Sequence, residues 1–316
     1  IRDRGNNDYV MVVDLNKSGQ PILLRDIMRF IADERNKRDF GDGQRLSFIP
    51  SKTIRIPVDT AAVKASGLIP NEMKNRVLPY LDFTIRRNYI VKNDLMLLDI
   101  LTTNDWKRPI YLTSPSGIGG AINLDEYCHL EGMVYKFLPV KATDYIRGLG
   151  GVSSDTCYDV LVNRIKQWGN LNDPRVTVDR ESFRNTAIPR QNYMRVAQSM
   201  LNKGKNEEAE KALDLSLQYF PTSKIFPDKY MLSYVDLYYA AKATEKANNM
   251  ALQLANIFSQ DLNFYLSLEP KYSSQYEEEM SENAYLIQRL SQVASQNGQD
   301  STAKAIESMI NLKLSQ

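Results

Sequence analysis

The chain has 316 residues, which is enough for two domains that each bury a hydrophobic core. Hydrophobic residues make up 43% of it and charged residues 25%, as in ordinary globular proteins. Its 40 basic and 38 acidic residues give a net charge of +2, which argues against nucleic acid and against a strongly anionic membrane surface as partners.

The amino-terminal end, Ile1-Arg2-Asp3-Arg4, has no initiator Met and no apolar segment. No run in the chain approaches the length of about eighteen apolar residues that would indicate a bilayer span. We therefore expect neither a signal peptide nor a membrane span in this sequence, and a chain that has been excised from something longer.

Residues 1–150 mix strand and helix patterns and predict an α+β or α/β domain with a modest mixed sheet. Short apolar or alternating runs predict strands, and apolar residues at helical spacing predict helices. The expected strands are 9–13, 46–49, 53–58, 80–86, 110–113 and 133–138, and the expected helices are 22–35 and 91–103. Residues 63–68 and 71–76 are expected to be short helical or irregular segments, and 40–43 a loop.

The helix at 91–103 is expected to end in a corner that contains Trp106 and Arg108. Pro109 lacks a backbone N–H and disfavours the helical conformation at Arg108, so the helix must end before it. As ligand contacts, the Trp106 ring would stack on a sugar and the Arg108 guanidinium would grip a carboxylate or phosphate. As structure, Trp106 would fill the helix–strand junction and Arg108 would hold helix carbonyls. We favour the structural interpretation because Trp is usually largely buried.

A second group of unusual residues follows at 127–135. Glu131 stands in an apolar stretch, where burial would raise its pKa, and we favour a structural ion pair with an arginine such as Arg108 over a role as an acid. His129, the single histidine, is expected to be structural because no nucleophile or carboxylate partner can be named for it. The candidate ligand or corner residues are Asn104, Trp106, Arg108, Tyr111, Glu131 and Tyr135.

The sequence indicates no cofactor, metal or catalytic constellation. One histidine and two separated cysteines are too few ligands for zinc, and residues 117–120 lack the Gly-Lys-Ser/Thr of a phosphate loop. Cys128 and Cys157 could form one disulfide in an oxidising compartment. We favour two buried thiols, because each cysteine has an apolar context.

Residues 141–185 are interpreted as a connector with an amphipathic helix at 158–168. The Gly- and Pro-containing segment 169–174 is a strong breaker, so we place the boundary there, with domains at 1–170 and 171–316.

From about residue 186 the pattern is almost wholly helical. Helices at 192–202 and 206–219, with Pro221 just beyond, have the form of a tetratricopeptide unit, a helix pair of about 34 residues. Weaker units run over 231–259 and 285–310, the latter repeating the spacing of Gly204 and Ala209 in Gly298 and Ala303. Three such pairs are about the minimum for a stable stack, and an irregular antiparallel bundle is the alternative.

Several of these pieces, taken in order, resemble a large bacterial membrane-protein family related to protein O-mannosyltransferases. The likeness covers residues 7–140 and continues more loosely through the helical tail. The matching residues are Asn7-Asp8-Tyr9-Val10, the helix at 22–31, Asp94-Leu95-Met96 with Asp99-Ile100-Leu101, Asn104-Asp105-Trp106-Lys107-Arg108-Pro109-Ile110-Tyr111, Tyr127, Leu130-Glu131-Gly132, and Tyr135 with Leu138-Pro139.

Members of that family carry an amino-terminal multi-span region of the C-type glycosyltransferase kind and a carboxy-terminal extracytoplasmic region. This chain has neither the spans nor the acidic loop motif of the first part, where the transferase chemistry is expected. The resemblance therefore implies a non-catalytic region on the periplasmic face of the inner membrane, anchored by spans outside this chain. It would hold acceptor protein, glycan or a partner near the membrane-embedded part of the same protein.

Two other functions are weighed against this one. The helix pairs could form a tetratricopeptide-type scaffold that binds a protein or peptide on its concave face. An independent soluble enzyme is disfavoured because no catalytic constellation can be named.

Overall fold

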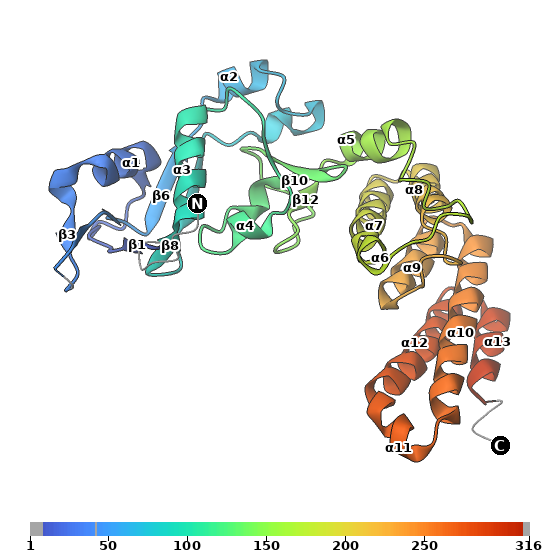
Figure 1. Ribbon diagram of the computed structural model, residues 1–316. Coiled ribbons are helices and arrows are strands. Elements are labelled where there is room, and N and C mark those ends of the chain that lie inside the picture. The colour runs from blue at the N-terminus through green and yellow to red at the C-terminus, as the bar shows by residue number, and fades with distance from the viewer. Residues whose placement is uncertain (1–8, 42, 312–316) are drawn as a thin grey trace. The chain divides into compact units, whose positions relative to one another are not determined.

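The computed structural model describes residues 9–41 and 43–311, so Asn7 and Asp8 of the family-like segment lie outside the described residues. The chain divides into two compact units, residues 1–157 and 158–316 (Figure 1). The first contains small mixed sheets with short helices and the second is helical, which confirms the expected order of an α+β part before an all-α part.

The division falls earlier than the expected boundary near residue 170, because residues 158–170 pack with the helices that follow. The Tyr193 hydroxyl donates a hydrogen bond of 2.9 Å to the Leu161 carbonyl, and Trp168 packs edge-on against Tyr193 and Phe220. Residues 158–170, which were expected to belong to a connector, are held in the helical unit by these contacts.

The strands of the first unit are short and form mixed sheets. They are β1 (Tyr9–Val12), β2 (Ile22–Leu23), β3 (Arg38–Asp39), β4 (Arg45–Leu46), β5 (Phe48–Ile49), β6 (Thr53–Pro57), β7 (Tyr80–Thr84), β8 (Tyr89–Val91), β9 (Ile110–Leu112), β10 (Cys128–Glu131), β11 (Val134–Phe137) and β12 (Gly151–Val152). The sheet orders are β5-β1-β8, β2-β6-β7 and β12-β10-β11-β9, and β3 pairs with β4. In each of the three larger sheets a central strand has one parallel and one antiparallel neighbour.

The β6–β7 pair shows why the alternating pattern predicted strands. Ile54, Ile56, Leu81 and Phe83 are buried on one face. Arg55 lies opposite Asp82 on the other face, and the two side chains form a bidentate ion pair with N–O distances of 2.6 and 2.7 Å. Successive side chains of a strand point to opposite faces, so the apolar half of the pattern enters the core.

Short helices alternate with these strands along the chain. They are α1 (Leu24–Ala32), α2 (Thr60–Ala65), α3 (Lys92–Asn104) and α4 (Ser116–Gly119), with a 3-10 helix at Asn71–Arg76. α1 packs against α3, β5 and β6. Ile22 and Leu23, expected in the first helix, instead pair with β6 as a parallel strand.

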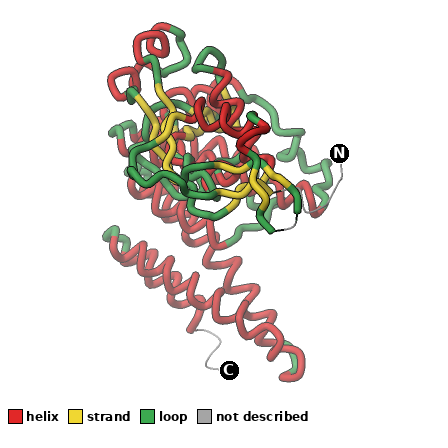
Figure 2. The backbone as a smooth tube through the Cα atoms, turned by 90° about the vertical axis from the view of Figure 1, so that its left-hand side faces the viewer, coloured by secondary structure: helices red, strands yellow, loops and turns green. Residues whose placement is uncertain are grey.

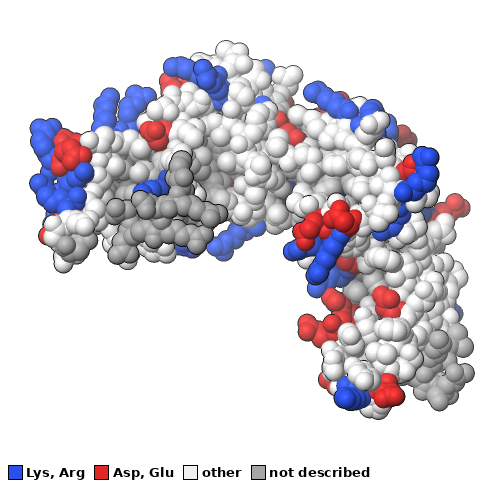
Figure 3. Space-filling model, viewed as in Figure 1, with Lys and Arg blue, Asp and Glu red and all other residues white. Residues whose placement is uncertain are grey.

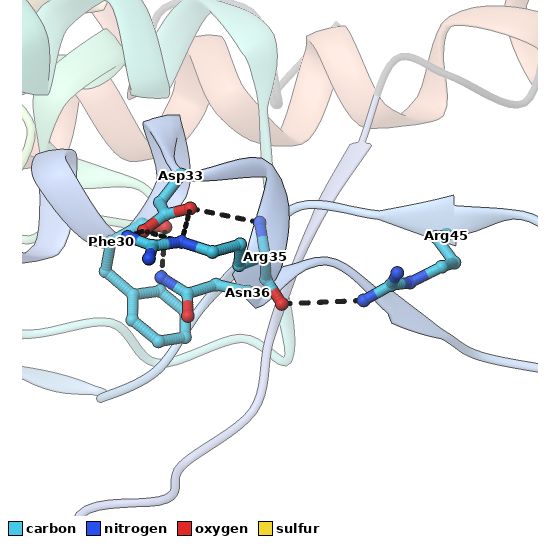
Figure 4. Close-up of polar contacts among 5 residues, drawn as sticks. All are labelled: Phe30, Asp33, Arg35, Asn36 and Arg45. Carbon is cyan, nitrogen blue, oxygen red and sulfur yellow. Dashed lines mark hydrogen bonds and ion pairs between the residues drawn. The ribbon is translucent and has the colours of Figure 1, made fainter.

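α1 ends at a small polar cluster (Figure 4). Asp33 accepts hydrogen bonds from the backbone and side chain of Arg35, and these bonds lower the Asp33 pKa to about 2. The Asn36 amide donates to the Phe30 carbonyl, and the Arg45 guanidinium reaches the Arg35 carbonyl. The segment after α1 is thereby tied to the β3–β4 hairpin.

The helices of the second unit follow α5 (Ser154–Tyr158), which lies at the division, and a π-helical turn at Asp159–Arg164. They are α6 (Arg180–Asn185), α7 (Ala187–Asn202), α8 (Asn206–Tyr219), α9 (Leu232–Ala240), α10 (Thr244–Ser267), α11 (Pro270–Ser273), α12 (Glu277–Gln296) and α13 (Asp300–Asn311). The helix expected at 158–168 is therefore wrong beyond Arg164. Its end is marked by a hydrogen bond from the Ile165 amide to the Val160 carbonyl, five residues back.

Three helix pairs organise this unit: α7 with α8, α9 with α10, and α12 with α13. Each turn contains one residue with positive φ, namely Gly204 (73°), Lys242 (64°) and Gly298 (72°). A buried alanine follows five residues later in each case, at 209, 247 and 303. A small side chain at that place lets the second helix of the pair approach the first closely. α10 also packs against α12, and Figure 2 shows the long helices side by side.

Candidate functional site

The corner after α3 is built by its own backbone and by Asn104. Asp105 and Trp106 both have positive φ, 47° and 58°, so the chain turns sharply where the helix ends. The Asn104 amide donates to the Arg108 carbonyl at 2.8 Å, and its oxygen accepts from the Arg108 backbone N–H at 3.2 Å. Asn104 thus closes the loop before Pro109.

Trp106 is a core residue of this corner. It is 8% exposed, stacks on Phe137 of β11 at a centroid distance of 5.6 Å, and donates from Nε1 to the Pro57 carbonyl at 3.3 Å. Its indole therefore joins the end of α3 to two sheets. A ring engaged in this way is not presented to a ligand.

Tyr111 and Glu131 do meet, on one face of the β12-β10-β11-β9 sheet. The Tyr111 hydroxyl donates to Glu131 Oε2 at 3.3 Å, and Lys136 Nζ lies 3.8 Å from Glu131 Oε1 and 5.8 Å from the centre of the Tyr111 ring. The expected ion pair of Glu131 with Arg108 is wrong. Lys136 takes that place because it lies directly opposite Tyr111 in the β9–β11 register.

Burial sets the electrostatics of this group. The side chains of Glu131 and Lys136 are 8% and 12% exposed. Burial raises the Glu131 pKa, and the positive charge of Lys136 and the Tyr111 hydrogen bond oppose that rise. The pKa of Tyr111 is also raised, by partial burial and by the neighbouring carboxylate. The group is thus a partly buried acid, base and phenol in contact, with Tyr111 half exposed at its edge.

The remaining candidates do not join this group. Tyr135 is buried on the opposite face of the sheet, alternating with Lys136 along β11. The exposed Arg108 side chain lies with Trp106 and Lys136 at a cavity of only about 10 Å³, too small for a ligand. Sequence reasoning missed Lys136, although its place between Tyr135 and Phe137 in an alternating strand indicated the polar face.

His129 and both cysteines are buried, as expected, and Cys128 and Cys157 are not joined by a disulfide. His129 Nε2 lies 2.8 Å from the Val140 carbonyl, an acceptor, so Nε2 carries the proton. Burial lowers the His129 pKa, and burial raises the Cys128 pKa to about 12. Neither group is poised for chemistry at neutral pH, because the imidazole is held neutral by its surroundings and the thiol is not ionised.

The helical unit carries a groove along α7 and α9. A cavity of about 230 Å³ adjoins an open hollow of about 470 Å³, and the two share Gln191, Met194 and Tyr230 in their walls. Ile188, Met231 and Leu237 add apolar surface, and Asp236 lies in the open part. Partial burial raises the Asp236 pKa, and the positive charge of Arg289 opposes that rise.

Arg190 lies at the wall of the groove and is 6% exposed. Its Nη2 donates to the carbonyls of Phe220 and Ile225 at 2.9 Å each, and burial lowers its pKa. Arg190 therefore fastens the segment after α8 to α7 and shapes this end of the groove.

Within residues 9–41 and 43–311, no helix is long and apolar enough to cross a bilayer. The same residues contain no group of three His, Cys, Asp or Glu side chains that could hold a metal ion.

Residues 2–156, almost the whole first unit, match the model of the family described as TMEM260-associated domain 2. The match supports the likeness of this unit to membrane proteins related to O-mannosyltransferases. No match was found among curated proteins or among solved structures.

Proposed function

We propose that this chain is a non-catalytic, extracytoplasmic region of a membrane protein of the glycosyltransferase type. It would lie on the periplasmic face of the inner membrane, anchored by spans outside this sequence. Its task would be to hold acceptor protein, glycan or a partner near the membrane-embedded part of the same protein. The observation that carries the proposal is the match of residues 2–156 to the TMEM260-associated family model.

The geometry of the first unit supports a positioning role over a catalytic one. Trp106, Glu131 and Tyr135 are buried in the packing of the sheet, and the cavity beside Arg108 is too small for a sugar. Trp106, which belongs to the family-like corner, thus holds the end of α3 against two sheets. A rigid platform of this kind suits the presentation of a bound partner.

The experiment compares the 316-residue chain with the full-length gene product in membranes. Both are incubated with radiolabelled nucleotide-linked and polyprenyl-linked mannose and with acceptor peptides. We expect no transfer by the chain alone, and transfer by the full-length protein that is lost when residues 1–157 are deleted. Turnover of either donor by the chain alone would contradict the proposal, as would full activity of the deletion protein.

The groove along α7 and α9 favours a second function, a tetratricopeptide-type scaffold for a peptide. Three helix pairs with the same turn conformation and the same buried alanine support this proposal. Met194, Leu237 and the 63%-exposed Tyr230 offer apolar contacts, and Gln191 and Gln198 offer amides for hydrogen bonds to a peptide backbone.

This function is tested by selecting peptides from a random phage-displayed library against the chain and measuring their affinity for variants. Tyr230→Ala should weaken the selected peptides at least about tenfold, which corresponds to loss of about 1.4 kcal/mol of binding free energy. Met96→Ala, at an equally exposed apolar residue of α3, is the matched control and should bind as the unmodified chain does. Peptides that bind the Tyr230→Ala chain equally well would exclude the groove.

A further inference from the structure

The helical hairpin of α10 and α12 ends in a segment without a core. Along α10 the last buried side chain is Ser259, and along α12 the first is Leu286. Between them, none of residues 261–283, all of which the structure describes, is buried. We call residues 261–283 the hairpin tip.

The tip is nevertheless rich in large apolar and aromatic side chains. Phe264 is 60% exposed, Leu266 51% and Tyr272 49%. Tyr265 and Tyr276 stack across the turn at a centroid distance of 4.9 Å and hold its two arms together. Phe264 packs edge-on against Tyr265 at a centroid distance of 5.6 Å, so Phe264, Tyr265 and Tyr276 form one partly exposed aromatic cluster. Such a cluster indicates an interaction site, because isolated apolar residues are common on protein surfaces but clusters are not.

The charge of the tip is one-sided. It contains six acidic residues and a single basic one, Lys271, in a chain whose overall charge is +2. Glu277, Glu278 and Glu279 form the first turn of α12, and Figure 3 shows acidic side chains over this part of the helical unit. Of the six, Glu282 is neutralised by Lys229 at 2.9 Å.

We propose that the hairpin tip is a docking surface for a basic protein segment that carries apolar side chains. The aromatic residues would supply the buried centre of the interface, where Tyr and other aromatic side chains contribute most of the binding energy. The glutamates would supply a complementary rim that steers and orients a positively charged partner. The negative charge disfavours two other occupants, an anionic membrane and a second copy of the same tip, because both would bring like charges together.

The test uses the full chain and two synthetic amphipathic peptides of equal length. One has leucine and lysine at helical spacing, and the other has glutamate in place of each lysine. We expect the lysine peptide to bind, to weaken several-fold when the salt is raised from about 0.05 to about 0.2 M, and the glutamate peptide not to bind. Binding of both peptides alike would overturn the proposal.

Two variants locate the binding. E277K/E278K/E279K should reduce the affinity for the lysine peptide at least about tenfold, a change of about 1.4 kcal/mol. E181K/E207K/E245K is its matched control, because those glutamates also occupy first turns of helices in the same unit and should not affect binding. Equal losses in both variants would overturn the proposal, since they would indicate attraction to the whole unit.

F264S tests the apolar centre. It should weaken binding of the lysine peptide at least about tenfold and leave Tm unchanged, because Phe264 is 60% exposed and is not part of a core. A fall in Tm of the size produced by a core substitution would overturn the proposal, because Phe264 would then be structural. The proposal would also be overturned if the unmodified chain binds phosphatidylcholine vesicles, or dimerises in analytical ultracentrifugation, and the variant does not.

Discussion

At the scale of single residues, Trp106 tests whether the family-like corner is structural. Trp106→Ala should lower the free energy of unfolding of the first unit by about 3–5 kcal/mol, because it empties a core site between α3 and β11. Urea denaturation measures this value. Trp106→Phe keeps a ring against Phe137 but loses the hydrogen bond to Pro57. It should therefore lower the free energy of unfolding by only about 1 kcal/mol relative to the unmodified chain. Unchanged stability together with loss of glycan binding would instead favour the ligand interpretation.

His129 should make the first unit sensitive to acid. In the folded state its pKa lies below the ordinary 6.5, because burial disfavours the charged ring. At a pH between the folded and the unfolded pKa of His129, the unfolded chain therefore binds more protons than the folded chain. The folded state is fully stable above pH 6.5 and loses stability as the pH falls from 6.5 through the folded pKa.

The comparison is with His129→Gln, whose amide can still donate to the Val140 carbonyl but does not titrate. Between about pH 7.5 and 5.5, Tm should fall more for the unmodified chain than for this variant. Asp144 raises and Arg76 lowers the same pKa, and neither is altered in the variant. Parallel pH profiles would show that His129 is not responsible.

Lys136 should stabilise the buried charge of Glu131. Lys136→Met leaves the carboxylate without its cation and should destabilise the first unit by about 1–3 kcal/mol at neutral pH. Because the Glu131 pKa is raised in the folded state, this loss should shrink as the pH falls through that pKa and the group takes up a proton. Adding Glu131→Gln to Lys136→Met should recover most of the loss in a double-mutant cycle. A loss that does not change with pH would contradict this explanation.

These residues show what local pattern can and cannot predict about the site. The end of α3 before Pro109 followed from the chemistry of proline, and the burial of Trp106 from its size. The partner of Glu131 did not follow, because it depends on the register of β9, β10 and β11, which brings Lys136 opposite Tyr111. Strand register is fixed by contacts between residues that are distant in sequence.

At the scale of elements, Lys242 occupies the place that Gly204 and Gly298 hold in the other two helix pairs. Its φ of 64° is strained for a residue with a Cβ atom, so Lys242→Gly should stabilise the helical unit by about 1 kcal/mol. Gly204→Ala should destabilise it by about the same amount. A Cβ added there meets nothing within 4 Å, so the cost is one of backbone conformation alone. Thermal unfolding followed at 222 nm measures both, and a destabilising Lys242→Gly would show that the lysine side chain outweighs the strain.

The sequence predicted best those elements in which the hydrophobic pattern continues over many residues or in which a Gly or Pro marks the end. α7, α8 and the strand β6 were of this kind. β8 and β10 were missed, because three- and four-residue strands give little period and His129 and Glu131 hide the apolar character of β10. The end of the helix at Arg164 was also missed, because a π-helical turn has no sequence signature as plain as proline.

At the scale of the whole molecule, each unit contains a core of its own. Ile49, Ile54 and Leu81 are fully buried in the first unit, and Tyr193, Leu213 and Leu254 in the second. A unit that buries its own apolar residues can fold alone. We therefore expect fragments 1–164 and 154–316, which both keep α5 intact, to be stable when expressed separately.

The measurement is calorimetric. Each fragment should unfold in a single transition, and its Tm should agree with one of two transitions of the full chain to within a few degrees. The effects of Trp106→Ala and Lys242→Gly should then appear only in fragments 1–164 and 154–316 respectively. Should either fragment lack a cooperative transition, the two units would depend on one another for folding. The first unit and the groove along α7 and α9 could then not act as independent parts of the protein.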